Sequence, residues 1–437
     1  MGIAREDAID IFAYALKASR VELAIESRIR FDGESMEVDG HRYALRQFER
    51  CVLIALGKAA STMTLAFLRQ AGKAAERFEG VVVAPEPFDA PSWRLQVFHG
   101  GHPSPNIGSV QAAEAILRIL AKLTERDLVV FLISGGGSSL VEQFLDIGTP
   151  LEVIAATHKA LVESGAPIAA INAVRKHLSA VKGGRLAAAA APAEQLTILV
   201  SDVPPGELDA LSSGPTMPDR STADDVYRIA EEYGLVQRLP ATVAAHLKAR
   251  SLRETPKPGE TVFARSRWSV LLDSSTLGAA AARRAAELGW HVVTDDTCDD
   301  WSANRAAEYL VDRVQALRRV HSKVCLLSAG EVTVAVPSSA TGKGGRNQQF
   351  ALLACELIAG HPITVLSAGS DGVDGNSPAA GGIVDGETLA RAAREGYRVD
   401  RALAAFDSHS LFVLLGDAIT TGRTGNNLRD LRMLLAP

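Results

Sequence analysis

Apolar runs and amphipathic, alanine-rich stretches alternate along most of the chain. In the first part, β-branched and aliphatic residues form short runs typical of buried strands. These runs cover residues 51–57, 80–85, 128–134 and 197–204. Helical spacing of apolar residues covers 5–30, 111–123 and 151–164. Strands that alternate with helices predict an α/β domain in which a parallel sheet is covered by helices on both faces.

The pattern starts again after residues 251–260, a polar stretch with two prolines that we interpret as a linker. Further strand-like runs cover 268–273, 291–296, 323–336, 363–370 and 410–416. Helical stretches separate most of them. The second half therefore predicts another α/β unit, with antiparallel pairing near residues 330–336. We expect a first domain at 1–250 and a second at 261–437.

Composition limits the class of protein. A chain of 437 residues, 47% hydrophobic and 22% charged, is globular and too long for one ordinary core. A net charge of −5 gives no general attraction to nucleic acid or anionic membranes, so neither is an expected partner. No run approaches the roughly 18 apolar residues of a membrane span. The four cysteines form no CxxC pair, and Cys51 and Cys325 lie in strand-like apolar runs, which predicts buried thiols at these two positions. We expect a cytoplasmic protein and leave a homodimer open.

A glycine cluster follows one of the predicted strands directly, in LISGGGSSL. The cluster consists of Gly135, Gly136 and Gly137, followed by Ser138 and Ser139. Consecutive glycines allow positive φ angles and can direct N–H groups toward one point, and a serine can cap a following helix. At the carboxyl end of a strand, this pattern predicts a phosphate- or carboxylate-binding loop. The alternative is a tight turn in which the glycines serve only packing.

Several basic side chains are candidates for binding a phosphoryl group. Lys58 follows the first strand of the sheet in ALGKAA, where an exposed surface lysine is an equally good interpretation. Arg346 lies beside Asn347 in GKGGRNQQF and is the strongest candidate for a charge clamp. The basic segment NAVRKHLSAVKGGRLA supplies Arg175 and Lys182, but such a run is more often a solvated helix face.

Aspartates on glycine-rich loops are candidate metal ligands. Asp202 begins a long loop after a strand, and Asp371 and Asp374 lie in SDGVDG. Hard oxygen ligands of this kind suit Mg²⁺ that is held mainly by phosphates and water. The alternative is an Asx turn at each aspartate. Anion sites, cations and oxygen ligands together fit phosphoryl transfer, although the chain has no Walker motif and no protein-kinase motif set.

Eight segments in order resemble the glycerate 2-kinase family, whose C-terminal part is called the MOFRL domain and whose members are often named hydroxypyruvate reductase. The segments are ALGKAA, GGHPSPN, LISGGGSSL, INAVRKHLSAVKGGRLA, SDVP with SSGPTMPD, GGRNQQFAL, SAGSDGVDGNSPAAGGIVD and LGDAITTGRTGNNLRDL. They extend from Ala55 to Leu431. One departure is Arg423, which stands where family members often have proline; it changes the local loop and bears on substrate choice.

The resemblance implies ATP-dependent phosphorylation of D-glycerate to 2-phospho-D-glycerate with a divalent cation. It also implies a Rossmann-like α/β/α domain, a second α/β domain of MOFRL type and an active site in the cleft between them. Lys58 and Arg346 match the family's catalytic cations. An NAD(P)H-dependent hydroxypyruvate reductase would need a dinucleotide site, and GGGSS lacks the GxGxxG spacing. A kinase for a related short sugar acid and a sugar-acid sensor without turnover are the remaining alternatives.

Overall fold

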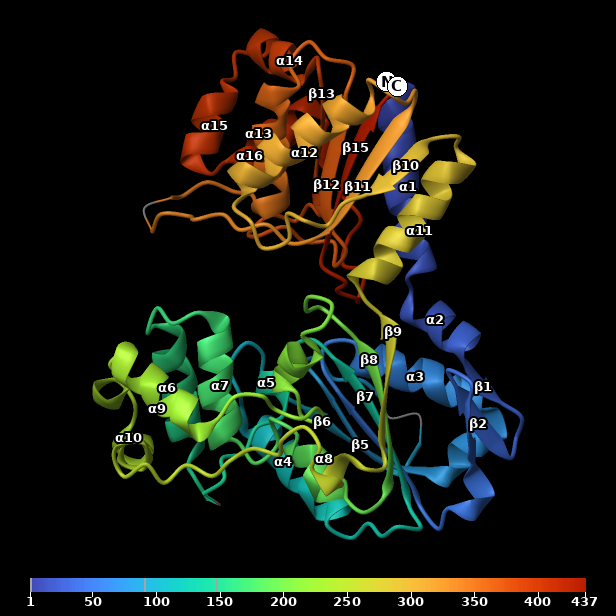
Figure 1. The fold of residues 1–437 in the computed structure, drawn as a ribbon, viewed down its shortest axis with the longest axis vertical. Helices are drawn as coiled ribbons and strands as arrows, with labels where there is room; N and C mark the ends of the chain where they lie inside the picture. The colour runs from blue at the N-terminus through green and yellow to red at the C-terminus, as the bar shows by residue number, and fades with distance from the viewer. Residues whose placement is uncertain (1, 90–91, 147, 339) are drawn as a thin grey trace. The chain divides into compact units, whose positions relative to one another are not determined.

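The computed structural model describes residues 2–89, 92–146, 148–338 and 340–437, which form two compact units. One unit, Val21–Leu271, is called here the parallel-sheet unit. The other combines the chain up to Arg20 with Leu272–Pro437 and is called the mixed-sheet unit. Each has its own sheet and helices, and each is described by itself (Figure 1).

A six-stranded sheet forms the centre of the parallel-sheet unit. Its strands are β4 (Cys51–Leu56), β5 (Phe78–Ala84), β6 (Leu95–His99), β7 (Leu128–Ser134), β8 (Glu194–Val200) and β9 (Ser266–Leu272). Their order is β6-β5-β4-β7-β8-β9, and all pairs from β6 to β8 are parallel. The chain winds from β4 to one edge, then returns to the other side of β4. Doubly wound sheets bind ligands where the winding reverses, which is here between β4 and β7.

Helices cover this sheet because its strands are apolar on both faces. The helices against the sheet are α3 (Ala60–Ala71), α4 (Ile107–Leu120) and α8 (Arg185–Ala190). Alternate residues of β4, namely Val52, Ile54 and Leu56, pack into one core with α4 and α8. A small antiparallel sheet precedes β4 and consists of β1 (Ile29–Phe31), β2 (Ser35–Val38) and β3 (His41–Ala44), with α2 (Val21–Arg28) before it.

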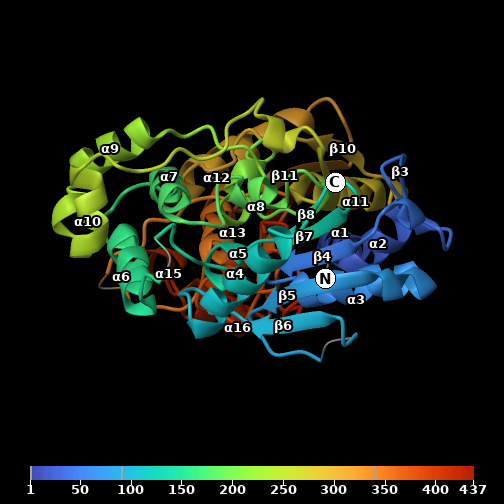
Figure 2. The same cartoon turned by 90° about the horizontal axis from the view of Figure 1, so that it is seen from below.

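A separate helical cluster lies beside the parallel sheet in both views (Figures 1 and 2). It contains α6 (Leu151–Val162), α7 (Ile168–Leu178), α9 (Ala223–Glu232) and α10 (Ala241–Lys248). These helices share a hydrophobic core of their own, which includes Leu161, Val174 and Val226. The cluster therefore holds α7, with its basic residues, next to the sheet.

The mixed-sheet unit also has six strands, and most of its pairs are antiparallel. In spatial order they are β10 (His291–Thr294), β11 (Val324–Gly330), β15 (Asp430–Ala436), β12 (Thr364–Gly369), β13 (Gly381–Asp385) and β14 (Ala418–Ile419). Only β10 and β11 pair in parallel. The helices that pack on this six-stranded sheet are α1 (Ile3–Ala18), α11 (Ser274–Glu287), α12 (Ala303–Leu317) and α13 (Arg346–Leu357). Three short helices follow: α14 (Thr388–Arg394), α15 (Val399–Ala405) and α16 (Ser408–Leu415).

Both units confirm the predicted α/β class and the parallel first sheet, but two expectations about strands are wrong in detail. The run 410–416, predicted as a strand, lies in α16. An apolar run this short fits either structure. Asp407 precedes α16 and left-handed Gly416 ends it, which are helix-boundary signals. The antiparallel pairing expected near residues 330–336 lies just before them: β11 pairs with the last strand, β15, up to Gly330, and residues 331–336 form no strand.

The boundary between the units also differs from the expected ranges 1–250 and 261–437. Residues 251–260 lie within the parallel-sheet unit, and β9 completes that unit's sheet. The N-terminal helix α1 packs on α11, β12 and β15, so it belongs to the mixed-sheet unit. Arg5 fixes it there through a buried ion pair with Asp417 and a partly buried one with Asp385.

The four cysteines are unpaired and buried, which confirms the prediction made for Cys51 and Cys325. Among the described residues, no helix is both long and apolar enough to cross a membrane.

Candidate active site

The loops that follow β4 and β7 are joined where the winding of the parallel sheet reverses. The backbone N–H of Lys58 donates to the Gly135 carbonyl at 2.9 Å, and the Ala59 N–H donates to Ser134 Oγ at 2.9 Å. Gly57 has a φ of +124°, and a Cβ there would lie 2.2 Å from Ser134 Oγ. Only glycine permits this contact, so the sequence Gly57-Lys58 is set directly against the glycine cluster.

Each of the three clustered glycines has its own structural reason. Only Gly136 has the positive φ expected for the cluster, at +82°. A Cβ on Gly135 would lie 1.7 Å from Asp202 Oδ2. A Cβ on Gly137 would lie 2.4 Å from Leu56 Cδ1 and 2.6 Å from Ser212 Oγ. The cluster therefore lets the carboxylate of Asp202, from the loop after β8, lie directly against the backbone after β7.

Ser212 and Ser213 were missed as site residues although they stand in the SSGP segment. Both have left-handed backbones, with φ of 50° and 60°. Ser212 Oγ donates to the Ser134 carbonyl at 2.7 Å and accepts from the Gly137 N–H at 2.9 Å. Non-glycine residues held at positive φ cost about 1–3 kcal/mol each and cluster at functional sites. The two serines fix the shape of the glycine loop.

The serines after the glycines differ in exposure. Ser138 Oγ lies 2.9 Å from Ser213 Oγ, at the partly exposed rim of the loop. Ser139 is buried and its hydroxyl turns back to the Gly136 carbonyl at 3.4 Å. Neither side chain caps the short helix α5 (Gly137–Leu140), because Gly136 occupies the cap position. Ser138 is therefore the serine in position to meet a ligand.

Lys58 and His102 flank the open side of Gly136. A Cβ built on Gly136 would lie 3.1 Å from Lys58 Cγ and 3.1 Å from His102 Cδ2. The Lys58 side chain is exposed, and among the described residues no hydrogen bond or ion pair engages its ammonium group. Burial and the charge of Lys58 lower the pKa of His102, so its imidazole is neutral at pH 7. His102 was not among the predicted site residues, although the GGHPSPN segment contained the signal.

Lys182 is buried inside the unit and is not an exposed phosphate ligand. Its ammonium forms an ion pair with the fully buried carboxylate of Glu142. Glu142 also accepts from Ser179 Oγ at 2.7 Å and lies 2.9 Å from His158 Nε2. Burial acts to raise the pKa of Glu142, but Lys182 and His158 hold it at about 2. The pair braces the segment after the glycine loop against the segment after α7.

Arg175 lies on α7 near this buried pair. Asn172, one turn earlier, lies 3.5 Å from Ser213 Oγ, so this face of α7 is directed toward the rim of the loop. Arg175 is partly buried, and its Nε has no hydrogen-bond acceptor among the described residues. Burial lowers its pKa. Of the two basic residues predicted from this segment, Arg175 keeps free hydrogen-bonding capacity and Lys182 does not.

In the mixed-sheet unit, Arg346 begins α13 and is clamped by two carboxylates. Its Nε and Nη2 contact the two Asp430 oxygens at 2.5 and 3.0 Å, and Nη2 lies 2.8 Å from Glu331 Oε1. Burial alone would lower the pKa of Arg346, but these carboxylates raise it above its ordinary value. The side chain is still 38% exposed, so a fixed guanidinium remains accessible to a ligand.

A ring of ion pairs, closed by a backbone hydrogen bond and by the peptide bond between Arg429 and Asp430, holds this clamp in place. Arg429, left-handed at φ +68°, pairs with both oxygens of Asp299 at 2.6 and 2.7 Å. Asp299 also accepts from the Glu331 N–H at 2.9 Å. Since Arg429 precedes Asp430 and Glu331 contacts Arg346, the ring closes around the arginine. This ring was not predicted, although Arg429 and Asp430 stand in the closing NNLRDL segment.

Two other predicted residues are internal supports of α13. Asp374 is buried and accepts from the backbone and side-chain N–H groups of Asn347 and Gln348 at 2.9–3.3 Å. Burial raises the pKa of Asp374, and these N–H groups oppose the shift. Asn347 is also buried and accepts from Ser367 Oγ at 2.7 Å. Asp374 therefore anchors the first turn of α13, which does not fit a metal ligand.

Asp371 is partly exposed on the loop after β12. Its Oδ1 accepts from the Val373 N–H at 3.0 Å, which is an Asx turn. A Cβ on Gly372 would lie 1.9 Å from the Gly422 carbonyl, so this loop packs on the segment that contains Arg423. Arg423 is exposed. Within the described residues, no three acidic, histidine or cysteine side chains form a ready metal site.

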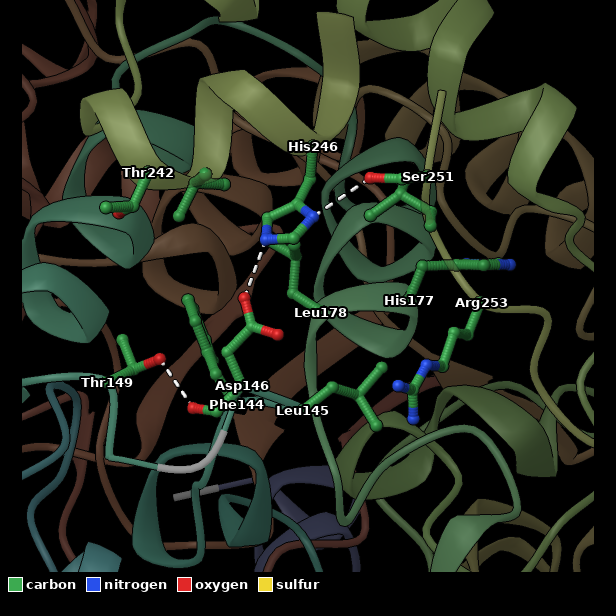
Figure 3. Close-up of a pocket in the computed structure, with 12 residues that line it drawn as sticks. Phe144, Leu145, Asp146, Thr149, His177, Leu178, Thr242, His246, Ser251 and Arg253 are labelled. Carbon is green, nitrogen blue, oxygen red and sulfur yellow. Dashed lines mark hydrogen bonds and ion pairs between the residues drawn. The ribbon is translucent and has the colours of Figure 1, made fainter. Parts of the chain in front are cut away.

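Arg346, Asp371 and Asp374 line one cavity of about 700 Å³ in the mixed-sheet unit. The parallel-sheet unit has a smaller cavity of about 180 Å³ in its helical cluster, lined by none of the predicted residues (Figure 3). There His246 bridges Asp146 and Ser251 at 2.6 and 3.0 Å, so these polar groups satisfy one another.

The fold and these groups define a two-unit α/β protein with a glycine-rich loop at the switch point of a doubly wound sheet. A family model described as a domain of unknown function (DUF4147) matches residues 7–248, and the MOFRL family matches 324–430. A D-glycerate 2-kinase of Thermotoga maritima is 36% identical over 88% of this chain and 90% of the relative. A protein of Agrobacterium vitis named putative hydroxypyruvate reductase is 37% identical over 88% of this chain and 99% of the relative.

Among solved structures, a glycerate kinase of Thermotoga maritima superposes with a TM-score of 0.84 at 32% identity, covering 99% of each chain. The chain belongs to the glycerate 2-kinase family.

Proposed function

We propose that the protein is an ATP-dependent kinase that transfers a phosphoryl group to the 2-hydroxyl of D-glycerate. Membership of the glycerate 2-kinase family supports the reaction class. The single observation that carries the site is the unpaired, exposed Lys58 ammonium beside Gly136 at the reversal of the sheet. A small hydroxy acid and a phosphoryl group are both anionic, and a free cation over a glycine loop suits either.

The chemistry asks the protein mainly to position the reactants and to neutralise charge. The glycerate oxygen forms a bond to the γ-phosphorus, the bond to ADP breaks, and the hydroxyl proton must leave. Neutral His102 and the carboxylate of Asp202 are the two groups at the loop that can accept this proton. We assign Lys58 and Arg346 to charge stabilisation, and Ser138 and Arg175 to binding the acid.

A divalent cation such as Mg²⁺ fits one of the three predicted aspartates best. Asp202 offers a hard oxygen directly beside the glycine loop, and a bound cation would neutralise phosphate charge there. Asp371 retains oxygen capacity beyond its Asx turn. Asp374 is excluded from this role because four N–H groups already occupy its oxygens.

The test is an ADP-release assay with D-glycerate, L-glycerate, erythronate and threonate, each with ATP and Mg²⁺. We expect D-glycerate to give the highest kcat/KM. A parallel reaction with hydroxypyruvate and NADH or NADPH, followed at 340 nm without ATP, addresses the activity in the name of the Agrobacterium vitis relative. Oxidation of the dinucleotide without ADP release from any acid would contradict the kinase assignment.

Gly135→Ala is expected to lower kcat at least tenfold while the protein stays folded. The added Cβ would occupy the place of Asp202 Oδ2, and a carboxylate end can swing away at little cost to stability. Asp202→Ala and the double variant complete a thermodynamic cycle. If the glycine acts through Asp202, Gly135→Ala has little further effect on kcat once Asp202 is removed. Fully additive losses would show that Gly135 acts independently of Asp202.

A further inference from the structure

The cavity beside Arg346 has a composition that differs from the glycine-loop site. Its apolar wall contains Val332, Val334, Val336, Val373 and Phe406. Its volume of about 700 Å³ lies within the range of cavities that bind cofactor-sized molecules. From these features, and resting on the proposed kinase function, we infer that this cavity of the mixed-sheet unit binds the adenosine part of ATP.

The charges around the cavity and around the glycine loop indicate which substrate each site binds. Four carboxylates line the cavity, from Asp300, Glu331, Asp371 and Asp374, against the single guanidinium of Arg346. One of these four, Glu331, is paired with that guanidinium, as is Asp430 from outside the cavity lining, so the lining keeps an excess of negative charge. Such a wall repels the carboxylate of glycerate. The glycine loop, with free Lys58 and neutral His102, attracts it.

Adenosine is neutral, and it has an apolar part and a hydrogen-bonding part that complement the two kinds of wall in the cavity. A purine needs an apolar wall, and the valines and Phe406 provide one. Ribose hydroxyls donate hydrogen bonds, and carboxylates only accept them. Glycerate has no apolar face and would leave most of this volume unfilled. Arg346, on the same wall, is then in position to meet the phosphate chain.

The walls of the cavity are held in place before any ligand binds. Asn376 Oδ1 accepts from the Gly344 N–H at 2.8 Å, and Asn376 Nδ2 donates to the Gly342 carbonyl at 3.1 Å. A Cβ on Gly344 would lie 2.1 Å from Ser408 Oγ, and one on Gly342 would lie 2.5 Å from the Phe406 carbonyl. The glycine-rich segment 342–345 is therefore a packed wall, and preorganised walls reduce the entropy lost on binding.

The test measures ADP and adenosine binding to the full-length protein by calorimetry, without glycerate. Val334→Trp fills the cavity, and we expect it to weaken both ligands at least tenfold. Val320→Trp places the same side chain at a 74%-exposed position of the same unit, outside the cavity lining, and should leave both affinities within twofold. Val336→Glu, at a 60%-exposed position of the cavity lining, is the second variant if Val334→Trp does not fold; it should weaken ADP by charge repulsion.

A folded cavity variant that binds ADP as tightly as the wild type would overturn the inference, as would a wild-type protein that binds ADP but no adenosine. Because these titrations need no turnover, they are independent of the proposed reaction. A third outcome separates the two proposals. If the wild type binds adenosine, Val334→Trp loses that binding, and the wild type phosphorylates no hydroxy acid, the cavity assignment is supported and the kinase function is rejected.

Discussion

Lys58→Ala is expected to lower kcat by about 100- to 1,000-fold, because removing one preorganised charge-stabilising group typically costs about 2.7–4 kcal/mol. The Lys58 ammonium makes no hydrogen bond or ion pair with a described residue, so the substitution removes a charge without leaving a buried partner unsatisfied. The measurement is steady-state kinetics with saturating ATP and glycerate, together with the melting temperature. The melting temperature should stay within a few degrees of the wild type.

Lys73→Ala is the control, since Lys73 is an exposed lysine of the same unit outside the site. Lys58 is a cleaner test than Arg346, because truncating Arg346 leaves Asp430 and Glu331 without their cation. A Lys58→Ala enzyme that keeps kcat within about threefold of the wild type, at most about 0.7 kcal/mol, would remove Lys58 from the mechanism.

Lys182→Met is expected to destabilise the protein by about 3–5 kcal/mol, the usual cost of removing one partner from a buried ion pair. Glu142 is fully buried, and the side chains that hydrogen-bond to it besides Lys182, namely Ser179 and His158, do not supply a permanent positive charge. Arg175 lies nearby but forms no ion pair with Glu142 among the described residues. Chemical denaturation at pH 7 measures the free energy of unfolding. Lys159→Met is the matched control, because the Lys159–Glu163 pair is exposed and 3.8 Å apart. Exposed pairs contribute about 0–1 kcal/mol.

The same variant predicts a pH dependence. In the wild type the pKa of Glu142 is lowered from 4.5 to about 2, so its contribution to stability is present above pH 4.5 and is lost as the pH falls toward 2. In Lys182→Met, the buried Glu142 carboxylate lacks its main counter-charge. Glu142 therefore takes up a proton at a higher pH than in the wild type, which relieves the cost of burying its charge. The stability difference between wild type and variant should therefore shrink as the pH falls from 7 to 3, first because the variant is relieved and then because the wild type loses stability below pH 4.5. A difference that is constant from pH 7 to pH 3 would show that Lys182 contributes through packing alone.

Local patterns predicted the parallel sheet and most of its strands because buried parallel strands are continuous apolar runs. They also located Gly57-Lys58 and the Gly135–Gly137 cluster at strand ends. The packing of α1 on the C-terminal sheet was not predictable, since it depends on an ion pair between Arg5 and residues nearly 400 positions away. The central strand β15 was missed, and its pairing with β11 and β12 is also between segments far apart in the sequence.

Site residues were harder to predict because residue type does not reveal the partner. Lys58 and Lys182 are both lysines in glycine-containing segments, but one is exposed and unpaired and the other is neutralised by Glu142. Asp374 looked like a metal ligand because glycines surround it, whereas its oxygens hold the first turn of α13. Which partner a buried charge finds is decided by tertiary packing, which one sequence does not show.

The identity of the phosphorylated product tests the central claim most directly. Wild-type protein is incubated with D-glycerate, ATP and Mg²⁺, and the product is examined by ³¹P and ¹H NMR. We predict a monoester whose phosphorus couples to the single proton on C2, formed together with one equivalent of ADP. A phosphorus coupled to the two protons on C3, or no phosphorylated acid while hydroxypyruvate is reduced by NADH or NADPH, would contradict the account.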